Sequence, residues 1–216
     1  MTDVFNVGAS LVRAAGAMPG AFMAARHGAR PAVVVPESLE GPGIAVHGTF
    51  YPVRTLNSDD TDVLQRFLQD GLSEESRRRR FMAPMPTVPK AAAAWLADRD
   101  GTRRVALAAL DPLDPTVLTG VVEYASVEDG PPEVAVAVAD AFQGRGIGKN
   151  LLRMLANMSV AAGEMVWRCD VLADNEGPIR LLNAVGEPEL GDVNGGVRSV
   201  LVELDPHKLM GTTVPI

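Results

Sequence analysis

The chain has 216 residues, a formal net charge of −7 at pH 7, 47% hydrophobic residues and 22% charged residues. This length suits one well-buried domain with an additional segment, since single domains usually have about 50 to 250 residues. The acidic balance and the 5% aromatic content argue against nucleic-acid binding, which depends on clustered Lys and Arg and on aromatic side chains that stack with bases.

The first patterned segment covers residues 4–25, where apolar residues recur at helical spacing. No uninterrupted apolar run reaches the roughly 18 to 20 residues of a membrane span, and no Lys or Arg precedes the stretch as in a signal peptide. We expect a helix that packs on its own domain or on a partner, with an interfacial membrane helix as the alternative. Pro and Gly residues between positions 36 and 48 predict a linker.

The rest of the chain predicts strands and helices in a mixed α/β (α+β) order, with strands in the majority. The helices are expected after the capping cluster 57–60, from Ser73, at 91–97, from Gly148 and at 179–184. The strands are expected at 51–56, 104–110, 117–126, 133–138, 166–172 and 199–204. Four consecutive arginines at 77–80 spread around a helix, so we expect a mostly solvated face, with an anion-binding patch as the alternative.

Cysteine and histidine give no indication of catalysis or of a metal site. The single cysteine, Cys169, lies inside an apolar run and is therefore expected to be a buried packing thiol. It cannot form an intramolecular disulfide, which is consistent with a reducing cytoplasm. His27, His47 and His207 lack metal-ligand spacing, so we expect no metal.

The most informative stretch is a glycine-rich turn, QGRGIG at 143–148, between a predicted strand and a predicted helix. Its N–H groups have no intrahelical partner, the helix dipole favours negative charge, and glycine lets a phosphate approach. A dinucleotide fingerprint would need glycine at Lys149, and a Walker A loop would need glycine at Gln143 and Ser or Thr at Asn150. What remains, Q-x-x-G-x-G, predicts a different phosphorylated ligand.

This turn resembles the pyrophosphate-binding loop of the GNAT superfamily of acyl-CoA N-acyltransferases. Further pieces between residues 48 and 205 resemble bacterial protein-lysine acetyltransferases of the Pat type. These pieces are YPVR at 51–54 with Asp59 and Asp60, LSEESR at 72–77 with Arg80 and Phe81, EVAV at 133–136, Asp174 with Asn175, and Gly186. The resemblance implies a central, mostly antiparallel mixed sheet flanked by helices. We therefore expect an acetyltransferase domain at 48–206 and a tail at 207–216. The resemblance does not cover residues 1–47, where the apolar spacing and the Pro and Gly residues predict a helical extension and linker.

The resemblance further implies an acetyl-CoA site. The pantetheine arm would pair with the main chain of Val136, Ala137 and Val138, and it would contact Asn175, for which an N-cap role is equally consistent. The pyrophosphate would lie on the turn that begins at Gln143 and continues through Gly144, Arg145, Gly146, Ile147, Gly148 and Lys149.

The resemblance implies Glu133 as the general base, with Glu123 and Glu128 as alternatives. Without a catalytic role, Glu133 would simply be a solvated glutamate at the start of a strand. A free lysine titrates near 10.4 and an unperturbed glutamate near 4.3, so burial must raise the carboxyl pKa or a water must relay the proton. Many relatives protonate the leaving thiolate with a tyrosine where this chain has Leu181, Leu182 and Asn183. Tyr51 and Tyr124 lie elsewhere, so solvent is the expected proton donor.

Three functions stay open at this point. The first is acetyl-CoA-dependent N-acetylation of protein lysine side chains, by direct attack in a ternary complex. The second is acetylation of a small-molecule amine, and the third is a non-catalytic acyl-CoA-binding module that regulates a partner through residues 1–47. Acceptor choice is expected to depend on loops at 72–90 and 187–198. We expect a cytoplasmic protein without a membrane span, for which a homodimer stays open.

Overall fold

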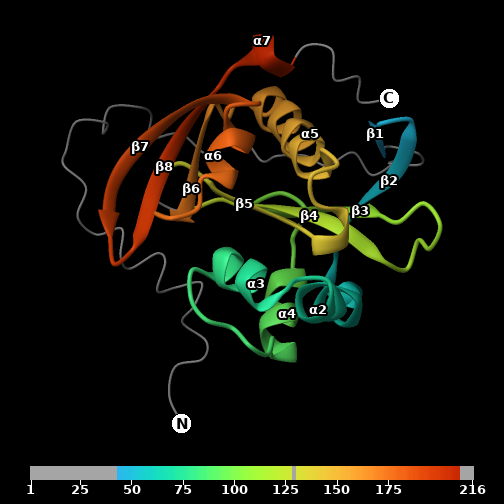
Figure 1. Ribbon diagram of the computed structural model, residues 1–216. Helices are drawn as coiled ribbons and strands as arrows, with labels where there is room; N and C mark the ends of the chain where they lie inside the picture. The colour runs from blue at the N-terminus through green and yellow to red at the C-terminus, as the bar shows by residue number, and fades with distance from the viewer. Residues whose placement is uncertain (1–42, 128–129, 210–216) are drawn as a thin grey trace. The chain divides into compact units, whose positions relative to one another are not determined.

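The computed structural model describes residues 43–127 and 130–209, so the helix expected at 4–25 lies outside the described residues. These residues contain an eight-stranded sheet in the order β1-β2-β3-β4-β5-β6-β8-β7 (Figure 1). Within this part of the chain, all neighbouring strands are antiparallel except β5 and β6, which are parallel. The strands are β1 (Gly43–Val46), β2 (Thr49–Thr55), β3 (Arg104–Leu110), β4 (Leu118–Ala125), β5 (Glu133–Val138), β6 (Val166–Leu172), β7 (Gly186–Asn194) and β8 (Val197–Leu204).

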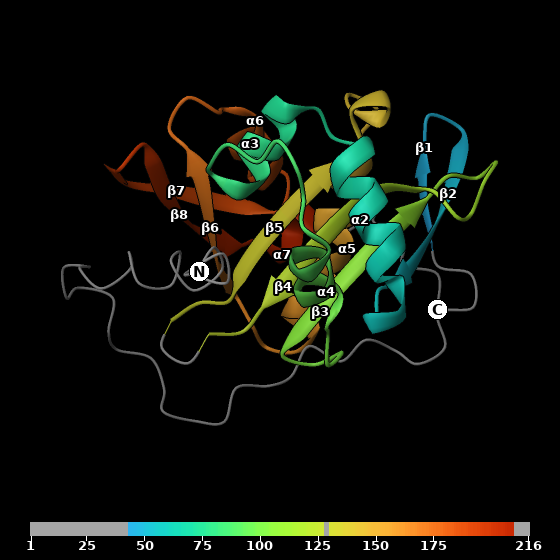
Figure 2. The ribbon, with the colours of Figure 1, turned by 90° about the horizontal axis from the view of Figure 1, so that it is seen from below.

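Helices cover both faces of this sheet. Figures 1 and 2 show α5, α6 and α7 on one face and α2, α3 and α4 on the other. The helices are α2 (Thr61–Asp70), α3 (Glu74–Phe81), α4 (Lys90–Ala97), α5 (Ile147–Ala161), α6 (Gly177–Leu182) and α7 (Pro206–Leu209), with short 3₁₀ turns η2 (Ser58–Asp60) and η3 (Asp140–Phe142). The structure thus confirms the mixed α/β fold that the sequence predicts.

Two hydrophobic clusters fix the helices to the sheet, one on each face. Successive strand residues point to opposite faces, so Leu107 of β3 packs in the cluster with α5 and Ala108 in the cluster with α2. The central strands β3 and β4 are buried almost throughout because helices cover them on both sides. Cys169 belongs to the α5 cluster, where burial raises the pKa of its thiol to about 12. The prediction of a packing thiol is confirmed.

Three elements lie where the sequence did not predict them. Strand β1 falls inside the expected linker, and its Ile44 and Val46 are buried in the core. Strand β7 occupies most of the expected loop at 187–198, and α7 begins just before the expected tail at 207–216. Residues 43–46 therefore belong to the sheet, not to a linker.

The arginine run on α3 is also not the solvated face that we expected. Arg77 is buried, and its guanidinium donates hydrogen bonds to the carbonyl oxygens of Gln69 (2.6 Å), Met85 (2.8 Å) and Pro86 (3.2 Å). Arg80, three residues later on the same side of the helix, is almost buried as well. Only Arg78 and Arg79 extend toward solvent, with side chains 33% and 50% exposed.

Candidate active site

The site begins where two central strands part. Strands β5 and β6 pair at a single position, Glu133 with Arg168. The Arg168 N–H bonds the Pro132 carbonyl at 2.8 Å, whereas beyond Glu133 the two strands diverge (Figure 2). Val136, Ala137 and Val138 follow this point on β5, paired with β4 on one side only. Their other main-chain edge is therefore available to an extended ligand, as an open strand edge is.

The glycine-rich turn follows β5 and leads into α5. Gly144 and Gly146 adopt left-handed φ angles of +73° and +89°. The Asn150 N–H bonds the Gly146 carbonyl at 3.1 Å, and for the N–H groups of residues 144–149 no acceptor exists in the described part of the chain. A Cβ built on Gly144 would meet nothing within 4 Å. The turn thus presents free N–H groups, at the positive end of a 15-residue helix, to open space.

Gly148 has a packing role in the same turn. A Cβ there would lie 3.1 Å from Val138 Cγ2 and 3.6 Å from Val136 Cγ2, so glycine lets α5 approach β5 closely. Ile147 beside it is buried in the core. These two residues hold the turn against β5 and offer a ligand their backbone alone.

The two cationic side chains of the turn differ in their contacts. The Arg145 guanidinium turns back to donate to the Ala141 carbonyl at 2.8 Å and lies 4.8 Å from the centre of the Phe142 ring. Lys149 is exposed and has no partner within the described residues. Of the two, Lys149 is therefore the cation that has no partner among the described residues.

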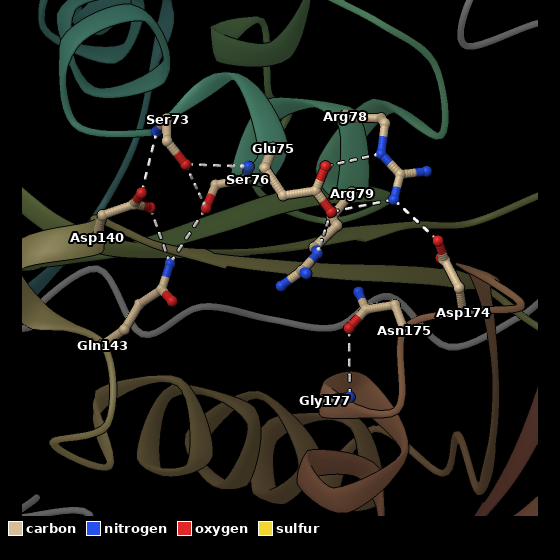
Figure 3. A network of polar contacts seen from close by, with 10 residues as sticks. All are labelled: Ser73, Glu75, Ser76, Arg78, Arg79, Asp140, Gln143, Asp174, Asn175 and Gly177. Atoms are coloured by element: carbon tan, nitrogen blue, oxygen red, sulfur yellow. Dashed lines mark hydrogen bonds and ion pairs between the residues drawn. The ribbon is translucent and has the colours of Figure 1, made fainter.

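Gln143, the first residue of the turn, connects it to α3 on the opposite face of the sheet (Figure 3). Its amide nitrogen donates to Asp140 Oδ1 at 2.9 Å and to Ser76 Oγ at 3.4 Å. Asp140 in turn accepts from the Ser73 N–H at 3.2 Å, and the Ser73 side chain caps α3. Gln143 therefore fixes the start of the turn and the N-terminus of α3 relative to each other.

The same helix is also tied to the segment after β6 (Figure 3). Arg78 contacts Glu75 at 2.8 Å and Asp174 at 3.0 Å. Hydrogen bonds from Arg78 and then Arg79 lower the pKa of the Glu75 carboxyl to about 2, so Glu75 is ionised at neutral pH. Helix α3 therefore has contacts on both sides of the place where β5 and β6 part.

Asn175 lies in that segment, beside α6. Its Oδ1 accepts from the Gly177 N–H at 3.3 Å, which supports the capping interpretation, although Glu176 is the residue at the N-cap position. For its amide nitrogen, the described residues provide no acceptor. One end of the side chain thus has a structural role, and the other end is free to donate to a ligand carbonyl.

Glu133 lies at the point where the strands part, with its side chain 28% exposed. Its Oε1 accepts a hydrogen bond and ion pair from Arg168, which the sequence analysis did not anticipate. The signal was present: Arg168 and Asp170 alternate with apolar residues in the β6 run VWRCDVL, which places two charges on one face of a buried strand.

The alternative glutamates differ from Glu133. Glu123 on β4 is buried between Arg80 of α3 and Arg99, whose guanidinium lies 3.1 Å away. A carboxylate between two arginines is a structural ion-pair partner, with little lone-pair capacity left for an incoming proton. Glu128 lies outside the described residues.

Neither tyrosine is placed to protonate a leaving group at the parting strands. Tyr51 is buried in the α5 cluster, with its ring edge-on to Phe142, and Tyr124 is buried on β4. In the α6 segment, Leu182 is buried and the Asn183 amide donates to the Ile179 carbonyl at 3.0 Å. The described residues contain no group of three or more His, Cys, Asp or Glu that could hold a metal. Nor does any described helix combine the length and apolar character needed to cross a bilayer.

Comparisons with known proteins agree with this geometry. Residues 62–186, more than half of the chain, match the model of the acetyltransferase (GNAT) family. The GNAT domain of S. lividans Pat is 27% identical with a TM-score of 0.68, over 79% of this chain and 99% of that one.

More distant structures show the same fold. The Thermoplasma acidophilum PaiA N-acetyltransferase in complex with coenzyme A is 17% identical, with a TM-score of 0.53 over 71% of this chain and 98% of that one. A cAMP-binding acyltransferase from Mycobacterium smegmatis is 22% identical, with a TM-score of 0.51 over 82% of this chain and 50% of that one. No curated protein matches the sequence.

Proposed function

Because the chain belongs to the GNAT acetyltransferase family, we propose that it transfers an acetyl group from acetyl-CoA to the side-chain amine of a protein lysine. The observation that carries this proposal is the parting of β5 and β6 at Glu133, directly before the glycine-rich turn and α5. The open strand edge and the free N–H groups are complementary to the two parts of the cofactor, an amide-containing arm and a pyrophosphate.

Groups among the described residues are complementary to the pyrophosphate and the pantetheine arm of acetyl-CoA. The N–H groups at 144–149 and Lys149 would hold the pyrophosphate, since the open space beside Gly144 admits a phosphate. The amides of the pantetheine arm would bond the free edge of β5 and the Asn175 amide nitrogen. Glu133 lies five residues before Val138, roughly 17 Å away at about 3.3 Å per residue, so an arm extended along β5 leads toward it.

Bound acetyl-CoA supplies a thioester whose carbonyl carbon accepts the amine. The nitrogen–carbon bond forms as the carbon–sulfur bond breaks, and the nitrogen loses a proton. We assign that proton to Glu133, directly or through a water, because its Oε2 has no donor within the described residues. The departing thiolate takes a proton from solvent, since the tyrosines are buried in the core.

The choice of a protein lysine as acceptor rests on the similarity to S. lividans Pat, which extends over 99% of that GNAT domain at 27% identity. The acceptor would approach on the α3 face of the sheet, where Glu133 lies. Helix α3 lies on this face, and its partly exposed Arg78 and its exposed Arg79 would be accessible to a protein acceptor there.

Mass spectrometry of a cell lysate incubated with isotope-labelled acetyl-CoA tests this proposal. The wild-type protein should add label to specific lysines, and E133Q, which keeps the shape of the side chain, should add little. Label on small amines and not on lysines would show that the acceptor is a small-molecule amine, and the proposed acetyl transfer would still hold. Equal labelling by wild type and E133Q would refute Glu133 as the base.

A further inference from the structure

Arg168 on β6 contacts the Glu133 carboxylate, although 35 residues separate the two in the sequence. It is the β6 residue opposite Glu133 in the single pair that joins β5 and β6. Its backbone N–H bonds the Pro132 carbonyl at 2.8 Å, and its side chain reaches the Glu133 carboxylate. Backbone and side chain of one residue therefore hold both the position where the strands part and the carboxylate at that position.

The two other arginines near this face are engaged with a different carboxylate. Facing residues of paired strands share a face, so Glu123, Glu133, Arg168 and Asp170 all lie on the α3 side of the sheet. Arg80 and Arg99 pair with Glu123. Among the described residues, Arg168 is then the cation that contacts Glu133.

The enclosed position of the Arg168 side chain limits the orientations that the bonded Glu133 carboxylate can adopt. Its side chain is 13% exposed, and its Nε is buried without a hydrogen-bond partner, 4.0 Å from Asp170 Oδ1. A guanidinium so enclosed has few alternative positions, and a carboxylate bonded to it loses rotamer freedom before any substrate binds. Since Arg168 engages Oε1, the Oε2 atom of Glu133 is left for a proton.

We propose that Arg168 is a positioning residue for the acetyl transfer, holding the Glu133 carboxylate where β5 and β6 part with Oε2 directed to the acceptor amine. This inference rests on the proposed function, because it takes Glu133 to be the proton acceptor. It assigns Arg168 no contact with either substrate. Arg168 acts by limiting the directions of the base, and misplacement by about 1 Å can cost roughly 100-fold in rate.

The test compares R168Q, R168K, E133Q and the double variant, with R54Q as control. Arg54 forms an ion pair of 2.7 Å with Asp60, at the start of α2, and R54Q therefore removes a comparable pair outside the site. The acceptor is a peptide around the most strongly labelled lysine of the lysate experiment. Turnover at saturating substrates, CoA affinity by calorimetry and melting temperature are measured for each protein.

We expect R168Q to lower kcat at least tenfold with CoA affinity within about twofold, and R168K to recover part of the loss. In the E133Q background, R168Q should change kcat less than about twofold, because there is no base left to position. R54Q should melt earlier and keep its kcat. Equal losses from R168Q in both backgrounds would show a structural role only and overturn the proposal.

Two further outcomes separate this inference from the function on which it rests. A large loss in E133Q with wild-type kcat in R168Q would keep Glu133 as the base and refute positioning by Arg168. Wild-type kcat in E133Q, or no labelled amine at all, would overturn the base assignment and the positioning together. A melting-temperature cycle over wild type, R168Q, E133Q and the double variant checks the ion pair itself, since the double variant should lose less than the sum of the single losses.

Discussion

Replacing Gly144 with valine should separate the proposed phosphate-binding role of the turn from the effect of backbone strain on stability. Gly144 has φ +73°, and Gly101, in the turn before β3, has the same φ of +73°. A Cβ at either position would meet no atom within 4 Å. Both G144V and G101V thus incur the left-handed backbone cost of about 1 to 2 kcal/mol without a clash at the Cβ atom. In a domain of this size, each should melt lower by roughly 2 to 8 °C.

Only G144V places its side chain where the proposed pyrophosphate lies. Its CoA affinity, measured by isothermal titration calorimetry, should fall at least tenfold, or about 1.4 kcal/mol, whereas G101V should bind within about twofold of wild type. The measurement is made well below both melting temperatures, so that each variant is folded. Equal CoA affinities for the two variants would refute the assignment of this turn as the phosphate site.

Four further outcomes can be checked with single substitutions or truncations. E133Q should lower turnover by about 100-fold to 10,000-fold with CoA affinity nearly unchanged. E123Q should leave the largely buried Arg80 and Arg99 without their carboxylate and cost about 3 to 5 kcal/mol in urea unfolding, and an E123Q variant as stable as wild type would contradict the structural role of Glu123. R77M should destabilise the protein by about 3 kcal/mol, because it leaves the buried Leu72 carbonyl and the partly buried Gln69 and Met85 carbonyls without this donor. R79M, at an exposed position, should stay within about 0.5 kcal/mol, and similar melting of both variants would contradict the buried role of Arg77. A chain that starts at Gly48 should be less stable than one that starts at Gly43 by about 3 kcal/mol or more, since it lacks the buried Ile44 and Val46. Equal stability of the two chains would show that residues 43–47 contribute no more to the fold than a linker does. Burial raises the pKa of the Cys169 thiol from 9.0 to about 12, so the unfolded chain loses this proton at lower pH than the folded protein. The free energy of unfolding should therefore fall above about pH 9, with a slope of up to about 1.4 kcal/mol per pH unit from this group. C169A should remove that slope in urea titrations, and an identical slope in C169A would assign it to other groups.

The sequence was sufficient for the central strands and the turn, and insufficient for the edges of the sheet. Strands β5 and β6 have the predicted bounds, 133–138 and 166–172, because each is a short apolar run bounded by turn residues. Strand β7, with the sequence GEPELGDVN, is a mostly exposed edge strand and lacks an apolar pattern. Strand β1 has four residues, of which the first is Gly43, and it lies between Pro42 and Gly48, so the glycine and proline signal outweighed its two buried side chains.

Contacts between distant segments account for the other differences. A run of four arginines does not reveal which side of the helix faces the core, because that depends on where the carbonyls of Met85 and Pro86 lie after folding. The pairing of Glu133 with Arg168 spans 35 residues and depends on the parallel register of two strands. Local pattern places each of these residues on a strand, and the tertiary fold alone brings them together.

The contacts of α3 have a thermodynamic consequence. Its N-terminus bonds Gln143 of the glycine-rich turn, and its Arg78 bonds Asp174 beside Asn175. Any ligand that alters the Gln143–Ser76 contact on binding at the turn therefore alters the free energy of placing α3. Linkage then requires reciprocity: the factor by which the cofactor changes the affinity for a molecule bound against α3 equals the factor by which that molecule changes the affinity for the cofactor.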